Sequence, residues 1–330
     1  MIDAVRLTFA ALRESRRPQA GDLAVRVLPG APPGVYLGLD LEARPHLLVE
    51  TADETTGSTG MAAVSVGQRT LVITGGPQRF VDVTCEDAAL TEVFDHFVVA
   101  VVERLAERPP VPAILEVVES WRRFLVSAAG PPGRDRLAAL FGELLVVLDL
   151  VKADPLRRID VWVGPFGARH DLRRGKAAIE VKTTRSHTAR VVTIHGEDQL
   201  LEPEDGSLHL HLVRIEEVPE GGVSVPALID AILSTGAPAG DVFDAVAASG
   251  VAPADFPSAA NVAFDIRERL TVPVDDRTPR IVPSSFASGA RPVGVVDLVY
   301  RVDLDHVLDR VLDDAAYAEL LARIASTEPA

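Results

Sequence analysis

The chain contains almost no cysteine and very little lysine. Its 330 residues include one cysteine, Cys85. A single thiol excludes a disulfide framework and a cysteine-based zinc site, and it is typical of the reducing cytoplasm. Only three of the 33 basic residues are lysines, and Lys176 and Lys182 lie close together. Because burial can tune the pKa of a lysine, a lysine kept where arginine is the rule favours a chemical role.

Long hydrophobic runs are also lacking. No apolar stretch approaches the length of a membrane span. Arg6 and Arg13 interrupt the first apolar stretch, which argues against a signal peptide. Apolar residues make up 47% of the chain and charged residues 25%, as in an ordinary globular protein. We therefore expect a cytoplasmic protein of two or three domains with no membrane partner.

The charge of the chain is unevenly distributed. The formal net charge of −15 excludes a protein that coats DNA by charge alone. Residues 157–190 nevertheless hold nine Lys/Arg against three acidic residues, whereas residues 215–266 contain no Lys or Arg. The basic segment could contact phosphates. On charge alone, a solvated basic loop is an equally good interpretation.

The first 110 residues are predicted to be β-rich. A short helix opens them, alternating apolar stretches separated by Pro and Gly follow, and a helix over about 87–107 closes them. The predicted strands cover 23–28, 36–41, 46–50, 62–66, 69–74 and 79–85. The proline-rich string "ERPPVP" then marks the end of a predicted β-rich N-terminal domain over 1–112.

The remaining residues alternate between helical and strand patterns. Helices are predicted at 113–128 and 134–150, and strands at 159–163, 168–172, 177–183, 191–195 and 208–215. Two helical stretches between 225 and 249, strands within 261–274 and 294–304, and a final helix follow. This order predicts an α/β fold, with a core domain at 113–216 and a helical plus β region at 217–330 that packs on the core. The helix–turn–helix pattern at 226–249 carries no positive residue, which argues against a winged-helix DNA reader.

The segment "HDLRRGKAAIEVKTT" (170–184) carries the main chemical signal. Pairing its two strands places Asp171 opposite Ala178, with Glu180 on the diagonal of the same face and Lys182 two residues further. Two carboxylates held that close repel each other unless a proton or cation intervenes. Mg²⁺ suits the gap, since it prefers oxygen ligands and usually takes one or two carboxylates with waters and a phosphate oxygen.

Such an ion would bind a scissile phosphate and lower the pKa of a bound water. Lys182 would orient that water or offset charge that develops on the phosphate. The alternative is an ordinary surface salt bridge between Lys182 and Glu180, worth at most about 1 kcal/mol.

Glu143 and Gln199 are further candidates for this site. The helical neighbours of Glu143 three and four residues away are all apolar, so its carboxylate needs a partner. That partner is either a metal, with Glu143 as a third carboxylate aimed at the strand site, or a buried arginine. Gln199 follows a predicted strand, where its amide could bond a water or phosphate near the site or serve only as a loop amide.

Several nearby residues are expected to play structural roles. Trp121 and Trp162 are predicted to lie in the core. His195 and Asp198 are a candidate metal pair for which we prefer a structural role. His170 is expected beside the site or on the surface.

In these residues the chain resembles the PD-(D/E)XK nuclease superfamily, which includes many restriction enzymes. The match runs from Glu143 through Asp171 to Glu180-Val181-Lys182, on an α–β–β–(α)–β core. The strings "LFGELLVV", "VWVGPFGARHDL", "IEVKTT" and "IHGEDQL" resemble a bacterial group of PD-(D/E)XK proteins associated with restriction and phage-defence gene clusters. His170 stands where the pattern has proline.

The resemblance implies a restriction-endonuclease-like core and Mg²⁺-dependent hydrolysis of phosphodiesters, with Mn²⁺ as a substitute. Asp171, Glu180 and Val181 would bind the metal, and Lys182 would assist the attacking water. Glu143 would be an accessory acid, and Gln199 maps onto a position that is often polar.

We therefore expect a DNA endonuclease subunit of a bacterial restriction or phage-defence system. Its partners would be DNA and other defence proteins of the methyltransferase or ATPase type, and a homodimer is compatible with this expectation. One alternative is a non-catalytic scaffold that keeps the nuclease fold. A weaker one is a nuclease that acts on RNA or in DNA repair.

Overall fold

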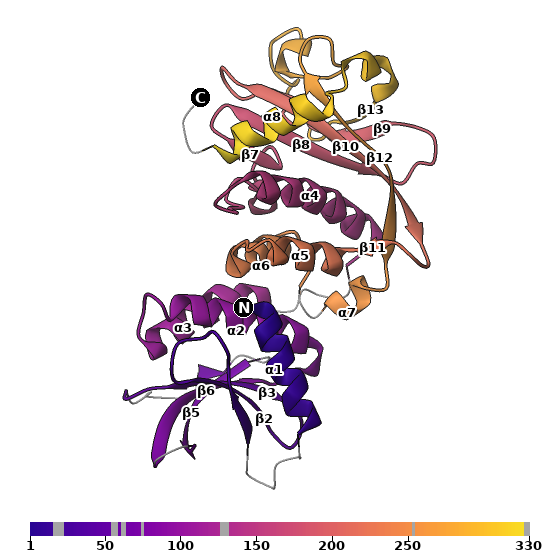
Figure 1. Ribbon diagram of the computed structural model, residues 1–330. Coiled ribbons are helices and arrows are strands. Elements are labelled where there is room, and N and C mark those ends of the chain that lie inside the picture. Colours follow the sequence, from indigo (N-terminus) through magenta and orange to yellow (C-terminus); the bar gives the residue numbers. More distant parts are fainter. Residues whose placement is uncertain are drawn as a thin grey trace. The chain divides into compact units, whose positions relative to one another are not determined.

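The computed structural model divides into two compact units (Figure 1). The N-terminal unit comprises Met1–Ala129 with Ala252–Ala254, and the C-terminal unit comprises Gly130–Val251 with Asp255–Ala330. The structure describes residues 1–15, 23–53, 59–60, 64–73, 76–125, 132–252 and 255–326.

The N-terminal unit is built on a six-stranded antiparallel sheet in the order β1-β2-β3-β6-β5-β4. Its strands are β1 Ala24–Val27, β2 Val35–Leu39, β3 Pro45–Glu50, β4 Thr59–Gly60, β5 Val64–Val72 and β6 Pro77–Cys85. Its helices are α1 Ile2–Glu14, α2 Thr91–Arg104 and α3 Pro110–Leu125. Helix α1 contacts β2 and helix α2 contacts β3 (Figure 1). Residues of the central strands, such as Leu47 and Val83, are buried.

Two predictions for this unit need correction. The separate strands predicted at 62–66 and 69–74 form one strand, β5, because β6 pairs with it over its whole length; residues 62, 63 and 74 lie outside the described residues. The helix predicted at 113–128 begins at Pro110, since proline suits the first turn of a helix. Its last predicted residues, 126–128, also lie outside the described range.

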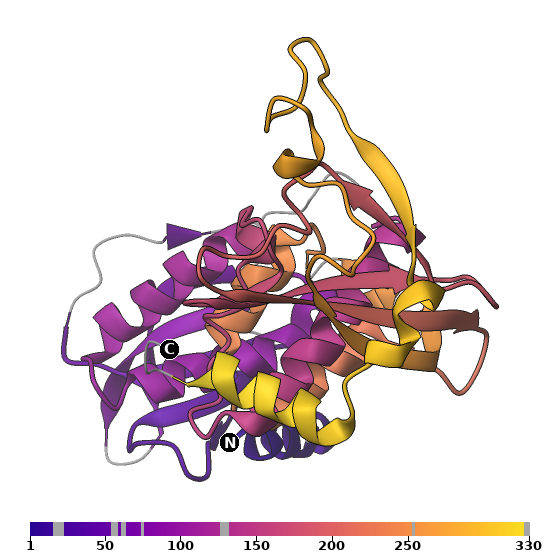
Figure 2. The ribbon, with the colours of Figure 1, turned by 90° about the horizontal axis from the view of Figure 1, so that it is seen from above.

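The C-terminal unit has a mixed α/β fold around a five-stranded sheet in the order β11-β12-β10-β8-β7. Its strands are β7 Leu172–Arg174, β8 Ala177–Thr184, β10 Ser207–Val218, β11 Val223–Ser224 and β12 Ala263–Val274. Strands β8 and β10 are parallel, and the other neighbours are antiparallel. A separate two-stranded sheet pairs β9 (Val191–His195) with β13 (Val299–Asp303). Figure 2 shows the long connection that leaves β12 before β13 begins.

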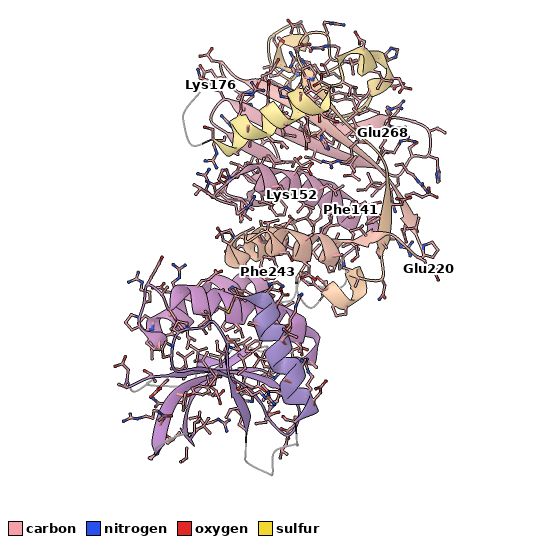
Figure 3. All side chains as sticks on the ribbon, viewed as in Figure 1. Phe141, Lys152, Lys176, Glu220, Phe243 and Glu268 are labelled. Atoms are coloured by element: carbon pink, nitrogen blue, oxygen red, sulfur yellow. The ribbon has the colours of Figure 1, made fainter. Side chains whose placement is uncertain are left out.

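The helices of this unit are α4 Arg134–Ala153, α5 Val225–Ser234, α6 Ala239–Ala248, α7 Phe256–Ala259 and α8 Asp314–Ala325. Strand alternation gives the large sheet two different faces. His211 of β10 stacks on Tyr317 of α8, with 5.4 Å between the ring centroids. Leu210 and Leu212 of the same strand instead join the core formed with β9 and β13. Phe141 of α4 packs on Phe264 of β12 at 5.1 Å (Figure 3).

The predicted strand at 159–163 is absent from this fully described stretch. The carboxylate of Asp154 accepts hydrogen bonds from the backbone N–H groups of Leu156 and Arg158, which turns the chain after α4. Arg157 between them has a positive φ of 54°. The stretch forms only a single bridge, from Trp162 to Leu172.

The predicted hairpin forms, but its first strand covers Leu172–Arg174 rather than 168–172, and its register differs by two residues from our prediction. Ala178 faces Arg173 rather than Asp171, and Leu172 faces Ile179. The turn is tight because Gly175 adopts φ +55°, a conformation that suits glycine. Figure 3 shows Lys176 at the tip. A shift of two residues leaves each side chain on its predicted face, since side chains alternate with a period of two.

The other strands and helices predicted beyond residue 130 are confirmed within a few residues at their ends. Among the described residues, no helix has the length and apolar character that crossing a bilayer requires.

The close packing of α4 on β8 yields a stability prediction. A Cβ atom added to Gly142 would overlap Thr183 Oγ1 and lie 3.3 Å from Thr183 Cβ. Alanine normally favours a helix by about 1 kcal/mol over glycine. Here we expect Gly142→Ala to destabilise the protein by about 1–3 kcal/mol, because overpacking outweighs that propensity. Urea unfolding measures the change.

The matched control removes the obstructing atom. Thr183→Ala, combined with Gly142→Ala, is expected to recover most of the lost stability. A Gly142→Ala protein more stable than wild type would contradict this account of the contact between α4 and β8.

Candidate active site

Three elements of the C-terminal unit bring the predicted chemical groups together. Glu143 comes from α4, Asp171 from the residue before β7, and Glu180, Val181 and Lys182 from β8. The pKa of Glu143 responds to Asp171, Glu180 and Lys182, so these four charged groups share one electrostatic environment.

Asp171 is held by its backbone and by its carboxylate. Its Oδ2 accepts a hydrogen bond from the backbone N–H of Val181 at 2.7 Å. Its carbonyl accepts from the N–H groups of Val163 and Gly164, both at 2.9 Å. A Cβ atom on Gly164 would lie 2.8 Å from Asp171 Cα, so glycine is required for this approach. The carboxylate is therefore fixed against the middle of β8.

Glu180 is the most deeply buried acid of the site, with 1% of the residue exposed. Its Oε1 lies 2.8 Å from Lys182 Nζ. Its Oε2 is buried and has no hydrogen-bond partner among the described residues. Burial, with the negative charge of Asp171, raises the pKa of Glu180 to about 8, although Lys182 opposes the shift. The site therefore contains a buried carboxyl oxygen that no described group of the protein satisfies.

The partner of Glu143 is a tryptophan, where the sequence suggested a metal or a buried arginine. Its Oε2 accepts a hydrogen bond from the indole Nε1 of Trp162 at 2.8 Å. Burial raises the pKa of Glu143 to about 8, assisted by the charge of Asp171. The prediction that Trp162 lies in the core is confirmed, with 1% exposed, but its role in orienting Glu143 was not foreseen. Burial also raises the pKa of Asp171, against the Val181 N–H bond and Lys182.

These groups fit a divalent cation that keeps some of its waters. Among the residues that the structure describes, no three His, Cys, Asp or Glu side chains form a metal cage by themselves. Mg²⁺ does not need one, since one or two carboxylates and a substrate phosphate usually suffice. Asp171 and Glu180 supply the carboxylates, and the unpartnered Oε2 of Glu180 suits a cation. Val181 can offer only its backbone carbonyl oxygen, because its side chain carries no ligand atom.

Gln199 makes a local contact that differs from the predicted one. Its side-chain oxygen accepts a hydrogen bond from the backbone N–H of His195 at 2.9 Å, which closes the turn after β9. The loop-amide interpretation accounts for this contact. His170, expected beside the site or on the surface, is buried: its Nε2 lies 3.1 Å from the carbonyl oxygen of Leu201. Burial lowers the pKa of His170 to about 4.

The basic segment 157–190 is mostly neutralised within the protein. Four of its arginines form ion pairs, namely Arg158 with Asp154, Arg174 with Asp160, Arg185 with Asp135, and Arg190 with Glu268 and Asp305. The exposed Arg169 and Arg173 bond to backbone carbonyls, and Lys176 is exposed at the hairpin tip. The surface available to phosphates is therefore smaller than the sequence predicts.

Comparison with known proteins identifies the family to which the chain belongs. The family model described as "Putative PD-(D/E)XK family member (DUF4420)" matches residues 5–305. The chain therefore belongs to this PD-(D/E)XK family, and the resemblance found in the sequence is confirmed. No curated protein and no solved structure matches the chain.

The raised pKa of Glu180 yields a prediction for the metal-free protein. Between pH values of about 4.5 and 8, the unfolded chain has released this proton while the folded chain keeps it. Stability should therefore fall as pH rises through this range, by at most about 1.4 kcal/mol per pH unit for one proton. Glu180→Gln removes this contribution and should make the slope less steep, leaving the part that Glu143 contributes. Urea unfolding in EDTA across the range measures both slopes.

The exposed Glu204 supplies the control. Glu204→Gln should keep the slope of the wild type. If Glu180→Gln kept it too, the carboxyl group of Glu180 would not hold its proton in the folded state.

Proposed function

We propose that this chain is a Mg²⁺-dependent DNA endonuclease with a restriction-endonuclease-like core. It would serve as the nuclease subunit of a cytoplasmic bacterial restriction or phage-defence system. The observation that carries the proposal is the meeting of Asp171, Glu180 and Lys182 on one hairpin, with one oxygen of Glu180 unpartnered. Membership of the PD-(D/E)XK family supports it.

The side chains divide the chemistry between them. Asp171 and Glu180 would hold the cation, which when bound supplies an activated water and a bridge to the phosphate. Lys182 Nζ lies 2.8 Å from Glu180 Oε1, where it could offset negative charge on the phosphate. Glu143, whose pKa is raised to about 8, would hold a proton near neutral pH and could serve as an accessory acid.

DNA affinity would come largely from a partner or a second copy. The chain carries a net charge of −15, and most arginines of its basic segment are paired internally. Phosphate contacts dominate the affinity of most DNA-binding proteins. We therefore expect weak binding to DNA by the isolated chain, with targeting supplied by other subunits of the system.

Cleavage of supercoiled plasmid tests the proposed activity. Nicking should require Mg²⁺ or Mn²⁺ and disappear in EDTA. Asp171→Ala and Lys182→Ala should each reduce the rate by on the order of 100-fold or more. The first removes a ligand of the cation, and the second removes a positive charge near the reacting phosphate. Lys152→Ala, at the end of α4, is the matched lysine control and should cut as the wild type does. An RNA substrate run in parallel tests the ribonuclease alternative.

Calorimetric titration with Mn²⁺ separates a nuclease from a scaffold that keeps the fold. We expect binding by the wild type and loss of binding in Asp171→Ala, since the cation would lose one of two carboxylates. Circular dichroism of the variant checks that it is folded. Absence of Mn²⁺ binding by the wild type would contradict the nuclease proposal and support the scaffold.

A further inference from the structure

The N-terminal unit contains a polar cavity on its sheet. Its volume is about 540 Å³, within the range of small-molecule sites. Its lining comes from β3, β5 and β6 and from residues next to these strands. It includes Arg44, His46, Gly67, Arg69, Asp82 and Thr84. His46 faces Thr84 and Gly67 faces Asp82 in the antiparallel register, so each pair shares a face of the sheet.

The floor of the cavity buries polar groups without fully satisfying them. His46 is 2% exposed and Asp82 6%. The Nδ1 atom of His46 lies 2.7 Å from Asp82 Oδ1 and 3.0 Å from Thr84 Oγ1. Its Nε2 has no hydrogen-bond partner among the described residues, and Asp40 Oδ2 lies 3.5 Å away. Both ring nitrogens of His46 therefore lie within ion-pair distance of a carboxylate, which fixes the imidazole in the lining of the cavity.

The charges around the cavity are balanced but leave donors in place. Arg69 Nε donates to Asp82 Oδ2 at 2.7 Å, while the described residues offer no recorded acceptor to its two terminal nitrogens. Arg44 bonds Glu86 at 2.8 Å. Two arginines thus face two carboxylates among the lining residues. Such a lining favours an uncharged ligand with both donors and acceptors over a free phosphate or a metal ion.

Gly67 leaves the cavity open. A Cβ atom added there would meet no atom within 4 Å, and its backbone does not require glycine. Glycine in the middle of a strand weakens the strand and often marks a place that a ligand approaches closely. Its position opposite Asp82 fits that explanation.

We propose that this cavity binds a nucleobase. If the proposed function holds, the base comes from the DNA substrate, turned out of the helix. A nucleobase is neutral and carries acceptors beside donors on one edge, and proteins that turn out a base read this edge. The terminal nitrogens of Arg69 would donate to a ring carbonyl, and Asp82 would accept from an amino group. No Phe, Tyr or Trp is among the lining residues, so recognition rests mainly on the edge.

The test measures binding in EDTA, where no cleavage occurs. Fluorescent duplexes carry one base opposite an abasic site, which makes that base easy to turn out; a fully paired duplex is the reference. We expect the wild type to prefer the duplex with one of the four bases by about tenfold or more, the scale of one good bidentate contact.

Two variants connect this preference to the cavity. Gly67→Leu fills the open space and should abolish the preference. Val72→Leu, on the same strand but exposed and outside the cavity, should retain it. Arg69→Lys keeps the charge beside Asp82 but loses the planar fork, and should weaken the preference. Thermal unfolding confirms that each variant is folded.

Equal binding of all duplexes by the wild type, with no binding of free nucleosides, would overturn the proposal. So would a preference that Gly67→Leu retains. Free-nucleoside binding that Gly67→Leu abolishes, without a preference among duplexes, would support base recognition and assign its source to small molecules. Plasmid nicking by the same wild-type protein is scored separately, so the cavity and the nuclease can fail independently.

Discussion

The hydrogen bond from the backbone N–H of Val181 to the carboxylate of Asp171 is the contact on which the candidate active site depends. It fixes the acid that precedes the hairpin against the strand that carries Glu180 and Lys182. Gly164 makes the approach possible, because no side chain fits beside Asp171 at that point. Gly142 has a similar role on the other side of β8, where it lets α4 pack closely and brings Glu143 to the site.

That arrangement concentrates three carboxylates around one lysine. The protein stabilises them in part: Trp162 bonds Glu143, Val181 bonds Asp171, and Lys182 bonds Glu180. The remaining imbalance appears as raised pKa values for all three acids. The repulsion among the carboxylates destabilises the site when no cation is bound. A cation relieves that repulsion, so the same repulsion favours cation binding. The cavity of the N-terminal unit differs, because its carboxylates are matched by arginines.

Predictions from the sequence succeeded where they rested on periodicity. Glu180 and Lys182 lie two residues apart on one strand, so they share a face whatever the register, and the error in the hairpin register left them together. The apolar surroundings of Glu143 correctly predicted a carboxylate in need of a partner. The strand at 159–163 failed, because Asp154 bonds the backbone of the next residues and turns the chain, a local competition that alternation does not reveal.

The sequence by itself determined the residue types of the candidate site, their order along the chain, and the family to which the chain belongs, because these are carried by local strings and a period of two. The tertiary structure alone decided that Trp162 is the partner of Glu143 and that most arginines of the basic segment are neutralised. It also decided that His46, Gly67 and Asp82 surround one cavity. These contacts join residues far apart in the chain, and strand pairing and helix packing set them.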